Sequence, residues 1–151
     1  MKSIFILLLT VITGILTSCS GSSEAKTRKE QEAEFKNAFG FSPPLTIVSI
    51  EYFDRYNRGV MDGGYGQWMS FTYNEESYRK IVANGYVSAG STSFPNGDAA
   101  PDWWPEAVTS DSSLFSRSHD DTPVDEGFSF REYLWYDESE GKVFFHKSYW
   151  D

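Results

Sequence analysis

The sequence predicts a single α+β domain in which an antiparallel sheet packs against helices. Segments rich in β-branched and aromatic residues occur in two pairs, at about 45–73 and 128–150, and the connection inside each pair is too short for a parallel crossover. A segment whose apolar residues have helical spacing lies between the pairs, at about 75–84. The chain has 151 residues, a length that fits one domain with one core.

Both predicted hairpins carry apolar side chains on the two faces of the sheet. In the second predicted strand, Met69 and Phe71 alternate with Trp68, and the hairpin at 128–150 shows the same two-sided pattern. A sheet with one face in water alternates apolar and polar residues instead, so the second face needs a cover or a function. The four strands are expected at 45–56, 65–73, 128–136 and 143–150.

Two helices are expected to pack on this sheet. For the helix at 75–84, Asn74 supplies an N-cap side chain and Gly85 follows the last turn. Its apolar face carries Tyr78, Ile81 and Val82. The N-terminal segment 28–39 is rich in helix formers and is followed by Gly40. Its short apolar face carries Phe35, Ala38 and Phe39.

The remaining segments are expected to be less regular. A short strand is expected within 86–94, and the proline-rich stretch 95–105 is expected to be irregular. The polar and acidic stretch 109–126 is expected to be a loop. The small polar residues of 19–27 favour a flexible linker, which leaves 28–151 as the folded domain.

The composition excludes several classes of protein. The chain is 40% hydrophobic and 23% charged, as expected for a folded domain rather than a disordered chain. Its net charge of -9 argues against nucleic-acid binding through phosphate neutralisation. The single cysteine excludes an intramolecular disulfide framework and a four-cysteine zinc site. We therefore expect no metal and no cofactor.

The N-terminus has the order of features found in an exported, lipid-anchored protein. Lys2 precedes an apolar run at 4–16, which is too short to span a bilayer core as a permanent helix. An aliphatic residue, two small residues and a cysteine follow, as Leu16-Thr17-Ser18-Cys19. This order resembles the lipobox of bacterial lipoproteins. The resemblance implies that residues 1–18 are a signal peptide and that Cys19 carries a diacylglycerol thioether after cleavage.

The same resemblance implies a location in the bacterial cell envelope, with the membrane as a partner through the lipid on Cys19. Ser20 after the cysteine favours the outer membrane in a Gram-negative host. Lys2 is the one charged residue in 1–18, so the remaining chain has a net charge of -10. Anionic lipid repels such a domain, and we expect the domain to be held off the membrane surface.

The aromatic residues, 17% of the chain, are the main candidates for ligand contact. Trp103 and Trp104 lie between Pro101 and Pro105, so one ring can anchor the segment while the other faces out. Two interpretations stay open for the tryptophan-bearing face of the sheet. The N-terminal helix or the long loop covers it, or it is an exposed platform for a sugar, peptide or protein. The candidate ligand-binding residues are Trp68, Trp103, Trp104, Trp135 and Trp150.

The sequence contains no complete catalytic motif. Ser77 and Lys80 match the SxxK spacing of penicillin-binding enzymes, but the companion motifs are missing and the chain is too short. We therefore expect a membrane-anchored binding domain, with an envelope protein or glycan as partner and no nucleic acid. The alternatives are a purely structural lipoprotein and a small hydrolase of glycan or peptide. A hydrolase would use carboxylate pairs such as Asp98/Asp102 or Asp120/Asp121.

Overall fold

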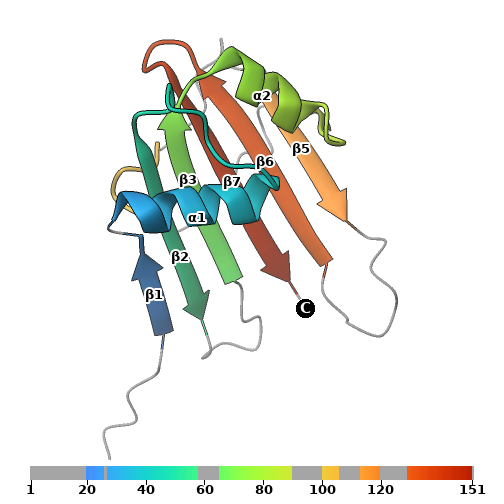
Figure 1. Ribbon diagram of the computed structural model, residues 1–151. Helices are drawn as coiled ribbons and strands as arrows, with labels where there is room; N and C mark the ends of the chain where they lie inside the picture. Colours follow the sequence, from blue (N-terminus) through green and yellow to red (C-terminus); the bar gives the residue numbers. More distant parts are fainter. Residues whose placement is uncertain are drawn as a thin grey trace, which may run out of the picture.

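The structure, a computed structural model, describes residues 20–25, 27–57, 65–89, 100–105, 113–119 and 129–150. Seven antiparallel strands form one sheet in the order β1-β2-β3-β7-β6-β5-β4, and two helices pack on it (Figure 1). This architecture confirms the predicted α+β class. No helix in these ranges is both long and apolar enough to cross a membrane. The strands are β1 (Ser20–Glu24), β2 (Ile50–Asn57), β3 (Tyr65–Thr72), β4 (Val87–Ser88), β5 (Ser113–His119), β6 (Ser129–Asp137) and β7 (Lys142–Trp150).

The two predicted hairpins form and join each other at the centre of the sheet. β2 pairs with β3, β6 pairs with β7, and β3 pairs with β7 between the hairpins. The turn of the second hairpin is fixed by Asp137, whose Oδ1 accepts hydrogen bonds from the backbone N–H (2.8 Å) and the hydroxyl (2.7 Å) of Ser139. Gly141 closes this turn with a φ of 61°, which favours glycine.

Strand β2 begins later than predicted. The sequence favours a strand from residue 45, but the strand starts at Ile50, and a turn occupies the residues before it. The backbone N–H of Ile47 donates to the carbonyl of Pro44 at 3.0 Å, and Thr46 accepts a hydrogen bond from the Asn74 amide at 3.0 Å. Two prolines restrict the backbone at this point, so the β-branched residues after them form a turn before the chain enters the sheet.

Two segments expected to be irregular are strands. Part of the predicted loop 109–126 forms β5, which pairs along its length with β6. Part of the predicted linker 19–27 forms β1, an edge strand paired with β2. The Ser23 backbone N–H and hydroxyl both donate to Asp54 Oδ1, at 2.9 and 2.6 Å. Backbone bonds to a neighbouring strand hold both segments, so neither needs strong strand propensity of its own.

Helix α1 (Arg28–Phe39) lies across β2, β3 and β7 on one face of the sheet (Figure 1). A capping box at Thr27 begins the helix, and Gly40, with a φ of 77°, ends it. The Phe35 side chain is completely buried. Its ring centroid lies 5.1 Å from that of Phe71 in β3, and the ring centroid of Phe39 lies 5.0 Å from that of Phe145 in β7. These edge-to-face contacts fix the helix on the centre of the sheet.

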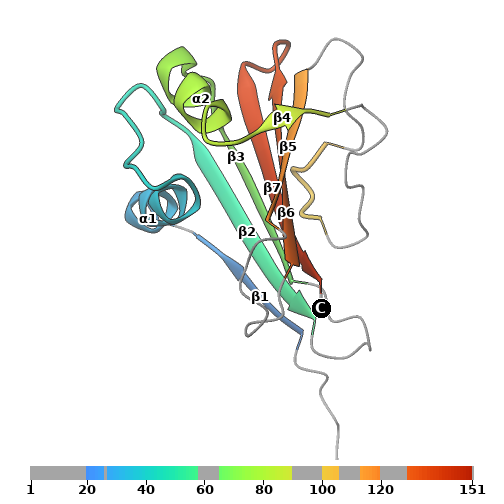
Figure 2. The ribbon, with the colours of Figure 1, turned by 90° about the vertical axis from the view of Figure 1, so that its right-hand side faces the viewer.

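Helix α2 (Glu75–Val82) packs on the same face, beside α1 (Figure 2). The side chain of Asn74 caps it by accepting a hydrogen bond from the Ser77 backbone N–H at 2.9 Å. The helix ends at Val82, two residues before the predicted end, and a turn with Gly85 at φ 87° follows. The Ile81 side chain is buried in the core that α1, α2 and the sheet share.

The opposite face of the sheet carries an aromatic cluster, which the segment 100–105 covers (Figure 2). Trp104 lies on this cluster, with its ring centroid 5.6 Å from that of Phe144. The structure therefore agrees with the interpretation in which the long loop covers the tryptophan-bearing face, whereas α1 covers the other face. The buried members of the aromatic cluster are Trp68, Trp104, Leu114, Tyr133, Trp135 and Phe144.

We predict that Gly66→Ala destabilises the fold by about 2 kcal/mol, a typical cost of overpacking. A Cβ at Gly66 would lie 2.7 Å from Trp68 Cζ3, and the Trp68 ring is buried between Phe53 and His146. Urea unfolding measures the loss. In a Trp68→Leu background, Gly66→Ala should lower the free energy of unfolding much less. An equal loss in both backgrounds would show that the Trp68 ring is not what the added methyl group meets.

Candidate functional site

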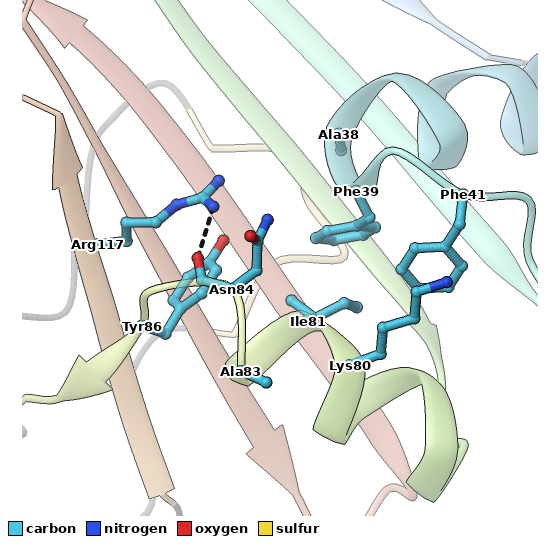
Figure 3. A pocket seen from close by; sticks show the side chains of 9 residues that line it. All are labelled: Ala38, Phe39, Phe41, Lys80, Ile81, Ala83, Asn84, Tyr86 and Arg117. Carbon is cyan, nitrogen blue, oxygen red and sulfur yellow. Dashed lines mark hydrogen bonds between the residues drawn. The ribbon is translucent and has the colours of Figure 1, made fainter.

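The residues of α1, α2 and β5 enclose a pocket of about 270 Å³ on the helix-bearing face of the sheet (Figure 3). The C-terminal end of α1, the C-terminal half of α2 and the turn after it supply most of the walls. Strand β5 supplies one residue, Arg117. The lining residues are Ala38, Phe39, Phe41, Lys80, Ile81, Ala83, Asn84, Tyr86 and Arg117.

One side of the pocket is apolar with a cation at its rim. Ile81 belongs to the core, Phe39 packs against the core, and both side chains line the pocket (Figure 3). Lys80 lies at the surface of α2, and its Nζ sits 4.0 Å from the ring centroid of Phe41. This distance permits a cation–π interaction, which holds the ammonium group beside the pocket.

The other side of the pocket is polar and is built around Arg117. Its Nη1 donates a hydrogen bond to the backbone carbonyl of Asn84 at 2.8 Å (Figure 3). Its guanidinium lies 4.8 Å from the ring centroid of Tyr86. The turn after α2 and strand β5 are thus joined through one side chain, and the guanidinium has a defined place in the wall.

A buried carboxylate, that of Glu132 in β6, holds Arg117 from behind. Glu132 is 2% exposed. Its Oε2 accepts hydrogen bonds from Arg117 Nε at 2.8 Å, from Arg117 Nη2, and from the Tyr86 hydroxyl at 2.9 Å. Burial raises the pKa of Tyr86 well above its usual value, so the phenol stays protonated and donates. Lys147 Nζ lies 3.4 Å from Oε1 and adds a second cation.

The sheet register explains why these three charges meet. Glu132 lies directly opposite Arg117 in β5 and opposite Lys147 in β7. Side chains at such cross-strand positions are near neighbours on one face. Glu132 shares that face with Leu134, because residues two apart in a strand point the same way. We call Arg117, Glu132 and Lys147 the charged row.

The described side chains that line this pocket are apolar, cationic or neutral polar. Among the described residues that line it, none is Asp, Glu, His or Cys, and the side chains able to carry a transferable proton are Lys80 and Tyr86. Across the described ranges, no group of three or more Asp, Glu, His or Cys residues could hold a metal. Fixed N–H donors beside an apolar wall can orient a small molecule without reacting with it.

The structure places the predicted tryptophan site mostly in the core. Trp68, Trp104 and Trp135 are buried, with exposed fractions of 4%, 7% and 1%. Trp103 is half-buried, and its ring centroid lies 6.1 Å from that of Trp104. For Trp150 the structure describes only the backbone, at the end of β7. Three of the five side chains therefore form a packed cluster and not an exposed platform.

A buried histidine, His146 in β7, completes the aromatic cluster. Its ring centroid lies 4.8 Å from that of Trp68. The ring Nδ1 lies 2.9 Å from the Gln67 carbonyl oxygen, which can only accept, so this nitrogen carries the proton. Burial lowers the pKa of His146 to about 4, and the imidazole is neutral near pH 7.

The other predicted site residues lie mostly outside the described ranges. Cys19, Asp98 and the pair Asp120/Asp121 are all outside them, and Asp102 is exposed in the turn that precedes Trp104. The charged row was not recognised from the sequence. The signal for it was Glu132, a carboxylate at a core-facing position between Phe130 and Leu134. Arg117 gave no comparable signal, because its segment was expected to be a loop.

No known protein family, curated protein or solved structure matches this chain. Its function must therefore be inferred from its own residues and their geometry. Two features carry the most information about function: the lipobox-like pattern of the N-terminal sequence and the pocket beside the charged row.

We predict that Glu132→Gln lowers the free energy of unfolding by about 3 kcal/mol, because it leaves Arg117 and Lys147 without their buried counter-charge. Urea unfolding at neutral pH measures the difference. Glu138→Gln removes the same charge from an exposed turn and should change stability by less than about 0.5 kcal/mol. Similar losses in the two variants would contradict the assigned role of the charged row.

We also predict that the fold loses about 3 kcal/mol of stability as the pH falls from 6.5 to 4, because of His146. The unfolded chain binds a proton near the usual pKa of 6.5, whereas the folded chain binds it only near 4. The contribution is complete above pH 6.5 and is lost through this window. Urea midpoints at several pH values measure it.

His146→Gln should flatten this part of the pH profile. His119→Gln is the matched control, because the chain has two histidines and this variant leaves His146 in place. A profile that keeps its slope in His146→Gln would show that other groups cause the loss.

Proposed function

We propose that this chain is a lipid-anchored protein of the bacterial envelope whose domain binds a small molecule in the pocket between α1 and α2. The anchoring half of the proposal rests on the sequence. A cationic start, an apolar run and Leu16-Thr17-Ser18-Cys19 occur in the order that a lipoprotein signal requires, and Cys19 is the single cysteine of the chain. The membrane is then a partner through the lipid on Cys19.

The binding half rests on one observation, the fixed position of Arg117 in the pocket wall. A buried ion pair costs desolvation energy, and well-packed apolar residues often stabilise a fold equally well. Here the buried charge of Glu132 directs a guanidinium to the edge of a cavity and holds it by two hydrogen bonds, and the Asn84 backbone carbonyl accepts a third. A donor held in this way loses little entropy when a ligand binds.

The pocket supports the hydrolase alternative less well. Hydrolysis by a carboxylate pair needs two acidic side chains facing a cleft. The described residues around this pocket include no acidic side chain. A binding role also agrees with the absence of a complete catalytic motif in the sequence.

The anchoring half is tested by Cys19→Ser. In a bacterial host grown with labelled palmitate, the wild-type chain should carry label and sediment with membranes, and Cys19→Ser should do neither. Ser22→Ala, just beyond the cysteine, is the control and should behave like the wild type. An unlabelled wild-type chain in the soluble fraction would contradict the anchor.

The binding half is tested by filling the pocket. Ala83 lines the pocket at its rim, whereas Ala33 is exposed on α1 and does not line it. Small molecules that bind the wild type in a ligand-detected NMR screen should lose binding to Ala83→Trp and keep it with Ala33→Trp. If every hit survives Ala83→Trp, with the variant folded by circular dichroism, the pocket is not the binding site.

A further inference from the structure

We propose that the ligand of this pocket is a small organic anion, with an anionic head group at Arg117 and a compact apolar body against the opposite side, where Lys80 at the rim adds positive charge. The inference rests on the proposed function, because it names the chemical class that the same pocket would take. Three independent features of the pocket support it: the sign of its charge, the donors that Arg117 has left, and the shape of the apolar side.

The first feature is charge. Two of the nine described lining residues, Lys80 and Arg117, are cations, and none is acidic. The whole chain has 22 acidic and 13 basic residues, so this pocket differs in sign from the protein around it. Glu132 faces Arg117 from behind, and its carboxylate is shared between Arg117 and Lys147.

The second feature is the number of donors. An arginine guanidinium has five N–H groups. Within the described residues, Arg117 uses one each on Nε, Nη1 and Nη2, for Glu132 and the Asn84 carbonyl. One N–H on each of Nη1 and Nη2 is left. The Asn84 side chain lies beside this guanidinium in the pocket (Figure 3) and offers a further donor. Anions are the acceptors that such charge-assisted donors bind most strongly.

The third feature is the apolar side opposite these donors. Phe39, Phe41 and Ile81 present carbon surface, and the volume of about 270 Å³ holds a molecule of about one aromatic ring with its substituents. Lys80 stands at the rim on this side, against the ring of Phe41. A hydrated inorganic ion would leave the apolar surface unused, whereas an organic anion fills both parts of the pocket.

Benzoate and benzamide, which have nearly the same shape and differ in charge, are suitable probes. The full-length protein in a nonionic detergent is titrated with each, and the side-chain resonances of Arg117 and Asn84 are followed by NMR. Benzoate should bind at least about tenfold more tightly than benzamide and should shift these resonances. Its affinity should fall as the salt concentration rises.

The variant Lys80→Gln tests the location of the charge. It should weaken benzoate binding about threefold, as expected for an exposed cation near the bound anion, and leave benzamide binding unchanged. Lys29→Gln is the matched control, because Lys29 is exposed on α1 and does not line the pocket. It should leave both affinities unchanged.

Several results would overturn the inference. Equal affinities for benzoate and benzamide would leave a binding pocket without preference for anions. Equal effects of Lys80→Gln and Lys29→Gln, or benzoate binding without shifts at Arg117, would place the anion elsewhere. No saturable benzoate binding would exclude this ligand class. The proposed function fails separately, through the Ala83→Trp and Cys19→Ser tests.

Discussion

The constraint on which this structure depends is that its central strands are apolar on both faces. Met69 and Trp68 are neighbours in β3, and both are buried, on opposite sides of the sheet. Each face therefore has to be covered. The helices cover one face through the phenylalanine rings of α1, and the segment 100–105 covers the other through Trp104. The high aromatic content, which suggested a binding platform, is used mainly to build two cores.

The helices leave room on their face of the sheet, and the charged row and the pocket occupy it. Glu132 stands two residues before the core residue Leu134 on the same face of β6, and it is almost as fully buried as Leu134. Its charge is tolerated because the register brings Arg117 and Lys147 beside it. The result is a wall whose arginine is fixed from behind by Glu132 and from the side by Asn84 and Tyr86.

The sequence predicted those parts of the fold that depend on local patterns. Alternation in 65–73 and the N-cap at Asn74 required no knowledge of neighbours, and β3 and α2 lie where these patterns place them. Strands β1 and β5 could not be predicted in this way, because polar and small residues become strands there by pairing with β2 and β6. The pocket was missed for the same reason, since Arg117 meets Glu132 only through the register of β5 on β6.

The start of β1 at Ser20 has a consequence for where the domain can act. A single peptide link of about 3.8 Å would separate a lipidated Cys19 from the sheet. The linker between the lipid and the folded domain would then be almost absent. Arg117 lies five strand spacings from β1, about 24 Å across the sheet. The pocket of an anchored domain would therefore stay within about 30 Å of the bilayer surface. Within that layer it would meet molecules released at the same membrane at high local concentration, and it would seldom meet those of the wider compartment.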